Sequence, residues 1–233
     1  MKKLFLGLSF FVLFGFTSAQ SEEFKSADSL NKIGDDYYWE EQYMTASEFY
    51  RNALEHIQKT DSVRLEADIL TNLGIVYDYL GNYSESSAYL MKALELSESV
   101  NYERGIANSL NNIGNLNFTY ENYEEALNYF QKSLDFEKNI DDTLGMASSY
   151  LNIGVVYKVL KDYDQALEYY YRAEALYKTK NADNYMPGVY NNLGILFLEK
   201  KYFDDAMDYF MMSKEYALKI DSRPDLCSSY NNI

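Results

Sequence analysis

Apolar residues recur along most of this chain with the spacing of amphipathic helices. Leu70, Leu73, Gly74 and Tyr77 stand at i, i+3, i+4 and i+7, which is one face of a helix. A second helical stripe is clearest after Tyr123, with members Ala126, Leu127, Phe130, Ser133 and Leu134. Short polar turns such as Lys161-Asp162-Tyr163 separate the two kinds of helix. The pattern therefore predicts an all-α chain made of antiparallel helix pairs.

The helix pairs repeat along the sequence with a period of 40 residues. The repeat is marked by the glycines Gly34, Gly74, Gly114, Gly154 and Gly194. A small residue stands twelve and again nineteen after each glycine, and a large apolar one stands sixteen after: Tyr50, Leu90, Phe130, Tyr170 and Phe210. We expect the missing side chains to let two helices approach closely, with the large residue filling the space. Pro187, in a first-turn register, predicts that first helices begin about seven residues before each glycine.

The repeat also defines the predicted organisation of the chain. Five units are expected at 27–66, 67–106, 107–146, 147–186 and 187–226, with the start of a sixth at 227–233. The last residues, Ser229 to Ile233, match the stretch that leads into each glycine, so we expect the natural protein to continue. An aromatic residue fifteen after each glycine is expected to pack between helices rather than to form a surface that binds sugars or aromatic ligands: Phe49, Tyr89, Tyr129, Tyr169 and Tyr209.

The first 19 residues have the three-part pattern of a secretory signal peptide. Met1-Lys2-Lys3 is basic, Leu4 to Phe16 is nearly all apolar, and Thr17-Ser18-Ala19 offers small residues for cleavage before Gln20. The apolar run of 13 residues is shorter than the roughly 20 needed to span a bilayer, which disfavours a membrane anchor. We therefore predict a periplasmic or secreted chain with a lead-in at 20–26. Tethering to a membrane would need a region beyond Ile233.

Composition excludes several classes of function. There are 36 Asp+Glu against 21 Lys+Arg, a net charge of -15, which disfavours binding to nucleic acid. Loss of residues 1–19 would remove two Lys and leave 19 basic residues, a net charge of -17. The single Cys and single His cannot form an internal disulfide or a metal cluster. We expect His56 at the surface and Cys227 to be a small buried residue, and we predict no catalytic residues, metal or cofactor.

The registers resemble those of the tetratricopeptide repeat across residues 24–233. A glycine, an aromatic three residues on, and Ala, aromatic and Ala at twelve, sixteen and nineteen carry the resemblance. It implies a right-handed superhelical α-solenoid of stacked antiparallel helix pairs. The period exceeds the family's usual value of about 34, and Asn117 replaces the aromatic in the third unit. The long period with Asn-Asn-[Leu/Ile]-Gly resembles the kinesin-light-chain-like branch, which is also frequent in extracytoplasmic sensor regions of bacterial signalling proteins.

In the resembling family, the first helices line a concave groove. Residues three before, one after, and four and five after each glycine are then expected to face it. Asparagine amides two before most glycines could bind a peptide backbone, as in the resembling branch, or could equally bond neighbouring helices. Lys32 replaces this amide in the first unit. The candidate peptide-binding residues are Asn31, Trp39, Asn72, Tyr79, Asn111, Asn112, Asn115, Phe118, Asn152, Asn191 and Asn192.

These features predict a non-catalytic scaffold that binds a protein or peptide. The acid excess favours a basic partner, mainly through the rate of association. Two roles remain open for such a scaffold. It can be the exported sensor or interaction region of a longer bacterial signalling protein, or a free periplasmic assembly protein without an output domain.

Overall fold

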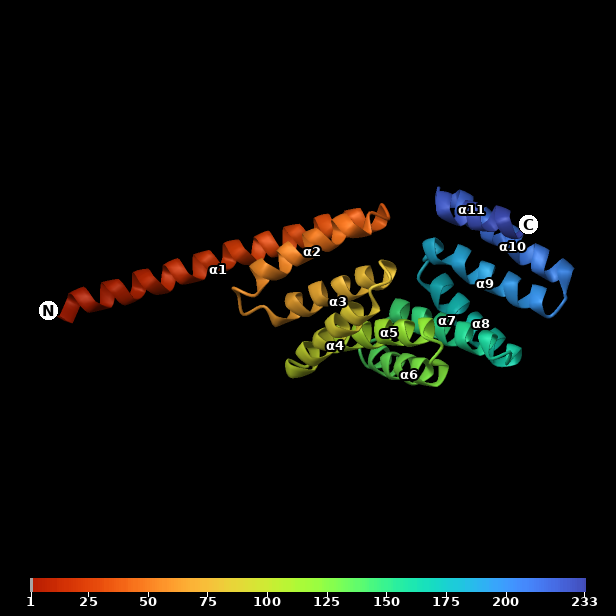
Figure 1. The fold of residues 1–233 in the computed structure, drawn as a ribbon, viewed down its shortest axis with the longest axis horizontal. Helices are drawn as coiled ribbons and strands as arrows, with labels where there is room; N and C mark the ends of the chain where they lie inside the picture. Colours follow the sequence, from red (N-terminus) through yellow and green to blue (C-terminus); the bar gives the residue numbers. More distant parts are fainter. Residues whose placement is uncertain (1) are drawn as a thin grey trace. The chain divides into compact units, whose positions relative to one another are not determined.

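The computed structural model describes residues 2–233 (Figure 1). Side chains are described from Ala19 onward. Helix α1 (Lys2–Trp39) begins within the predicted signal segment, and the side chains of 1–18 lie outside the described residues. Export therefore stays a prediction. None of the helices searched over the described part of the chain combines the length and the apolar character needed to cross a membrane.

The chain divides into two compact units, one ending at Leu116 and the other running from Asn117 to Ile233. Unit 1 contains α1, most of α5, and the three helices α2 (Tyr43–Ile57), α3 (Val63–Tyr79) and α4 (Tyr83–Ser99). Helix α5 (Glu103–Thr119) ends just beyond the boundary. Unit 2 contains α6 (Tyr123–Asn139), α7 (Thr143–Val159), α8 (Tyr163–Thr179), the 3₁₀ turn η1 (Asp183–Tyr185), α9 (Met186–Glu199), α10 (Phe203–Lys219) and α11 (Arg223–Asn232).

Within each unit, consecutive helices pack side by side in pairs. Helix α1 lies against α2 and α3 against α4 in unit 1, while α7 lies against α8 and α9 against α10 in unit 2 (Figure 1). Weaker packing joins successive pairs, as between α2 and α3 or α8 and α9. The predicted all-α architecture of antiparallel helix pairs is confirmed.

The registers predicted for close packing form the core of each pair. Every residue twelve, sixteen or nineteen after a repeat glycine is at most 2% exposed, including Ala46, Tyr50 and Ala53. The glycines permit this approach: a Cβ at Gly34 would lie 2.5 Å from Cε1 of Tyr50. At Gly194 it would lie 2.5 Å from Cε1 of Phe210. The packing explanation for the repeat is therefore confirmed at these positions.

Aromatic stacking joins the two helices of most pairs. The ring three after the glycine stacks on the ring fifteen after it, with centroids 5.2 to 5.5 Å apart, in Tyr37–Phe49, Tyr77–Tyr89, Tyr157–Tyr169 and Phe197–Tyr209. Asn117 stands where the third pair, α5 and α6, would need a ring, and there the Lys132 ammonium lies over Tyr129 instead, 5.6 Å from the centroid. The expectation that these aromatics serve packing is confirmed for the four stacked pairs.

The predicted helix starts were wrong for every first helix except α9, which begins beside Pro187. Helix α1 begins at Lys2, and four others begin four residues before the expected position: α3 at Val63, α5 at Glu103, α7 at Thr143 and α11 at Arg223. Proline restricts only its own helix, where the 3₁₀ turn η1 precedes it. In α3, α5 and α7, alanine stands at the position of Pro187. Because alanine is the best helix former, these helices can begin one turn earlier.

The turns inside the pairs share one helix-ending geometry. At the end of α3, Gly81 has φ +72° and the Asn82 N–H donates to the Tyr77 carbonyl at 2.8 Å, which is a Schellman motif. Lys161 takes the same left-handed conformation, at φ 64°, after α7. This reversal holds the second helix antiparallel to the first.

The burial predicted for Cys227 was also wrong. Cys227 is exposed, whereas Ala27, Ala67 and Ala147 are at most 1% exposed at the same register. In those earlier pairs the second helix covers this side of the first. The described chain ends at Ile233, before such a helix, and α11 is buried only at Ser229.

Candidate functional site

Two adjoining cavities lie along the first helices of unit 1. One, of about 380 Å³, is lined by Asp35, Tyr38, Trp39, Tyr50, Asn72 and Ile75. The other, of about 340 Å³, is lined by Tyr38, Gly74, Ile75, Asp78, Tyr79, Leu90, Asn112 and Asn115. Because they share Tyr38 and Ile75, we treat them together as the aromatic groove, with an α1 cavity and an α3 cavity. Five of the eleven predicted peptide-binding residues line it: Trp39, Asn72, Tyr79, Asn112 and Asn115.

Aromatic rings from α1, α2 and α3 pack together at the aromatic groove, and Tyr38 lines both cavities. Tyr38 meets Tyr79 edge to face with ring centroids 5.7 Å apart, and Tyr43 stacks on Tyr79 at 4.6 Å. Burial raises the pKa of the Tyr38 phenol, and contact with Tyr79 raises it further, so this phenol stays protonated. Trp39 is 80% exposed and Tyr79 is 57% exposed. Large rings this open to solvent are unusual in a stable core and offer area to a ligand.

The polar floor of the α1 cavity is tied together by hydrogen bonds. The Tyr50 hydroxyl donates to Oδ1 of Asp35 at 2.8 Å. The Asn72 amide donates to the same Oδ1 at 3.2 Å and to Oδ1 of Asn31 at 3.1 Å. Burial raises the pKa of Asp35, the bond from Tyr50 opposes that effect, and the neighbouring charge of Asp36 adds to it. The Asn72 amide thus holds α3 against α1, which is the inter-helix role weighed for the asparagines.

The polar groups of the α3 cavity are held differently. One carboxylate oxygen of Asp78, Oδ1, is buried and has no hydrogen-bond partner. Burial raises the pKa of this carboxyl group. The Asn112 amide donates to the Asn108 carbonyl one turn earlier in α5, at 2.8 Å. Asp78 is consequently the one described acid of the groove whose buried oxygen lacks a donor.

The remaining predicted residues occupy other places. Asn31 bonds Asn72 beside the α1 cavity, and Asn111 is half-buried on α5. In unit 2, Phe118 packs on Tyr123 with centroids 5.7 Å apart, and Asn191 accepts a hydrogen bond from Asn232 at 2.6 Å. Asn152 and Asn192 are half-buried on α7 and α9. The peptide-binding role of the eleven residues stays a prediction.

Several residues that line the aromatic groove were not among the eleven predicted peptide-binding residues. Four of them belong to the registers expected to face the groove: Asp35, Tyr38, Ile75 and Asp78. They were left out because the predicted set consists of asparagines and aromatic residues. The sequence held a signal for Asp78, because the other first helices carry Tyr, Phe, Lys or Leu at its register. Tyr50 and Leu90 could not be found this way, because they belong to the packing register sixteen after the glycine.

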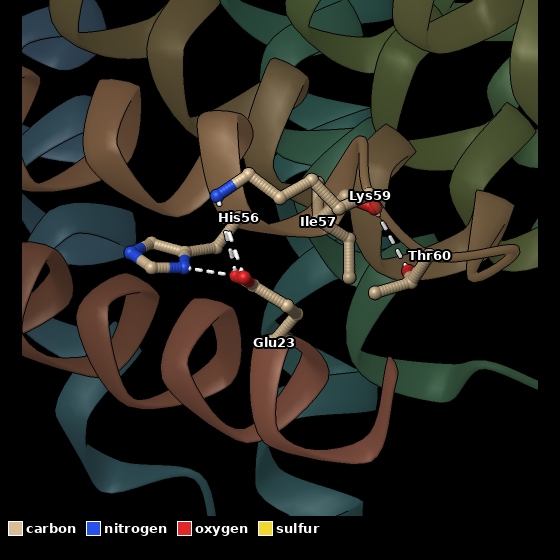
Figure 2. Close-up of polar contacts among 5 residues, drawn as sticks. All are labelled: Glu23, His56, Ile57, Lys59 and Thr60. Atoms are coloured by element: carbon tan, nitrogen blue, oxygen red, sulfur yellow. Dashed lines mark hydrogen bonds and ion pairs between the residues drawn. The ribbon is translucent and has the colours of Figure 1, made fainter. Parts of the chain in front are cut away.

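His56 lies outside the aromatic groove and pairs α2 with α1. Figure 2 shows the Glu23 carboxylate between Nδ1 of His56, which it contacts closely, and Nζ of Lys59 at 3.4 Å. The hydrogen bond with His56 lowers the pKa of Glu23, and the charge of Lys59 adds to this. The His56 side chain is 37% exposed, so the predicted surface position is confirmed. No group of three or more potential metal-binding side chains occurs among residues 19–233.

The family of the chain follows from its sequence. The family profile described as Tetratricopeptide repeat matches residues 25–99, 80–139, 105–179 and 145–219. The chain belongs to the tetratricopeptide repeat family. No curated protein matches this tetratricopeptide repeat chain significantly by sequence.

Solved structures share the fold of this tetratricopeptide repeat chain at low sequence identity. Aspartyl phosphate phosphatase F from Bacillus subtilis has a TM-score of 0.76 at 18% identity, over 93% of this chain. A Rap protein complexed with Competence and Sporulation Factor has 0.80 at 18%, over 86%. The Rap conjugation gene regulator of plasmid pLS20, in complex with the Phr* peptide, has 0.77 at 16%, over 86%. The chain spans 57%, 56% and 55% of these proteins respectively, so the likeness shows the fold alone.

Proposed function

We propose that this tetratricopeptide repeat chain is a non-catalytic scaffold that binds a peptide segment of a partner protein in the aromatic groove. The observation that carries the proposal is the pair of adjoining cavities in unit 1, walled by the exposed rings of Trp39 and Tyr79. Half-exposed aromatic rings beside a few polar groups are the usual make-up of a peptide-binding surface. One fold neighbour is described in complex with a peptide, which supports the same class of ligand.

Tyr79 provides the test of this proposal. Peptides are selected from a random displayed library on the full chain, and the affinities of synthetic copies are measured by calorimetry. We expect Tyr79→Ala to weaken binding at least about tenfold, because an aromatic anchor at the centre of an interface commonly contributes this much. Tyr79 is exposed, so circular dichroism should show unchanged helical content.

Tyr202→Ala is the matched control for this test. Tyr202 is 54% exposed, close to the 57% of Tyr79, and it lines neither cavity. We expect it to change the affinity by less than about twofold. A library that yields no binder, or peptides that bind both variants equally well, would contradict the proposal.

The wider role that we propose is an exported sensor or interaction region of a longer bacterial signalling protein, with a basic partner. The signal-like segment 1–19 and the acid excess support this role. N-terminal sequencing of the protein recovered from the periplasm or medium of its own host is expected to begin at Gln20. A chain retained inside the cell with Met1 intact would rule out export. A reading frame beyond Ile233 that adds only further repeats would instead favour the free assembly scaffold.

A further inference from the structure

The α3 cavity brings together a carboxylate with one unpartnered buried oxygen, that of Asp78, and two aromatic rings, those of Tyr38 and Tyr79. Its lining comes from Tyr38 of α1, from Gly74, Ile75, Asp78 and Tyr79 of α3, from Leu90 of α4, and from Asn112 and Asn115 of α5. All of these lining residues lie in unit 1. The volume of about 340 Å³ is large enough for one long side chain of a bound peptide.

Asp78 is poorly placed for the stability of the free protein. Its Oδ1 is buried without a hydrogen-bond partner, and none of the described lysines, arginines or His56 forms an ion pair with it. It also stands in the last turn of α3, where the carbonyl end of the helix disfavours negative charge. A buried carboxylate oxygen without a donor lowers the stability of a fold, so packing within the free protein does not account for this residue.

The adjoining α1 cavity contains a carboxylate, Asp35, whose Oδ1 has hydrogen-bond donors. Asp35 accepts hydrogen bonds from the Tyr50 hydroxyl at 2.8 Å and from the Asn72 amide at 3.2 Å. Asp78 lacks the equivalent donors at its buried oxygen. The missing donors of Asp78 are what a ligand can supply.

We propose that the α3 cavity is a subsite for an arginine side chain of the bound peptide, with Asp78 as its counter-ion and the rings of Tyr38 and Tyr79 as its walls. A guanidinium group is planar, always charged and rich in donors, so it can bond a carboxylate and stack on an aromatic face together. The two rings meet edge to face at 5.7 Å beside the carboxylate. A lysine ammonium could pair with Asp78 but would not use the rings as a planar group does.

This inference rests on the proposed function and deepens it, so its test begins with the peptides selected on the full chain. We expect arginine at one fixed position in most of them. Replacing that arginine by citrulline keeps the size and hydrogen-bonding plane but removes the charge. On the unchanged protein the citrulline peptide should bind at least about tenfold more weakly than the arginine peptide. A peptide with lysine at this position should bind more tightly than the citrulline peptide, but it should regain less than half of the lost binding free energy.

The variant Asp78→Asn tests whether the loss of affinity on replacing arginine by citrulline comes from Asp78. In this variant the citrulline and arginine peptides should bind within about twofold of each other. Asp208→Asn is the matched control, because Asp208 is an exposed acid on α10 and its change removes the same charge. There the citrulline effect should remain at its full size. Asp78→Asn should also raise the Tm of the free protein by about 2 °C or more, whereas a stabilising Asp78 would give a lower Tm.

The outcomes separate the subsite from the proposed function. Peptides that bind and depend on Tyr79, but that carry no arginine or tolerate citrulline, would overturn the subsite and leave peptide binding intact. A citrulline effect that persists in Asp78→Asn, or a lysine peptide that binds as well as the arginine peptide, would also overturn it. Failure to select any peptide would overturn the proposed function itself.

Discussion

Gly154→Ala is expected to destabilise the protein by about 1–3 kcal/mol, although alanine is the better helix former. A Cβ at Gly154 would lie 2.6 Å from Cδ1 and Cε1 of Tyr170 and 3.3 Å from the Ala166 carbonyl oxygen. Tyr170 is 0% exposed, so its ring has little space into which it can move. Urea unfolding followed by circular dichroism gives the change in the midpoint.

Gly188→Ala is the matched control, and the opposite sign is expected. Gly188 lies in α9 of the same unit, is exposed, and would have no atom within 4 Å of its Cβ. Alanine there should stabilise the protein by about 0.5–1 kcal/mol by restricting the unfolded chain. If the two substitutions have the same sign, the close approach of the helices does not explain the repeated glycine. In a Tyr170→Ala background the penalty of Gly154→Ala should disappear, because the two residues are in contact.

Glu137→Gln is expected to stabilise the protein by about 1–3 kcal/mol above neutral pH. Glu137 is only 4% exposed, and its Oε1 accepts hydrogen bonds from the hydroxyls of Ser133 and Ser149, each at 2.9 Å. Its Oε2 is buried without a partner. Burial raises the pKa of Glu137, the two serine bonds lower it in part, Asp142 raises it and Lys138 lowers it.

The direction of this pKa shift fixes the expected dependence on pH. Because the folded pKa lies above the unfolded value, the folded state favours the protonated acid. The contribution of Glu137 to the stability of the unchanged protein is therefore complete below the unfolded pKa and is lost as pH rises through the folded pKa. Asp68, whose pKa burial raises to about 6, adds a loss of the same sign in both proteins.

The difference between the two proteins isolates Glu137 from the other acids. Free energies of unfolding from urea titrations at a series of pH values should nearly coincide at acidic pH and separate as pH rises. The amide keeps an oxygen for Ser133 and Ser149, so their hydrogen bonds are retained. A constant difference at all pH values, or a gap that closes as pH rises, would contradict a buried, uncompensated carboxylate at this position.

Much of the fold could be predicted because every unit uses the same registers. A position that is glycine in all five units, opposite a large residue such as Tyr50 or Phe130, has one simple physical explanation, and the large residues are buried as expected. Helix starts were less predictable, because Pro187 marks only α9 while the other helices add a turn. Burial of Cys227 was predicted from the buried alanines at the same register of earlier units. In those units a second helix covers this position, whereas no such helix follows α11 within the described residues, and Cys227 is exposed.

The candidate site was only partly predictable, because its chemistry departs from the repeat. The groove registers gave Trp39 and Tyr79, which line the two cavities. The asparagine ladder could not be divided into binding and structural members from sequence, since an amide serves both roles. At Asn72 the amide hydrogens are directed to Asn31 and Asp35 of α1. Whether Asp78 has a partner depends on every side chain around it, which spacing along the chain cannot show.

Trp39 gives the most direct measurement of the central claim, which is that a peptide occupies the aromatic groove. It is the one tryptophan in the chain, lines the α1 cavity and is 80% exposed. A selected peptide without tryptophan is titrated into the full chain while tryptophan emission and binding heat are recorded together. We predict that Trp39 emission shifts to shorter wavelength and saturates at the same peptide concentration as the heat. Saturating heat with unchanged Trp39 emission would place the peptide elsewhere and contradict the account.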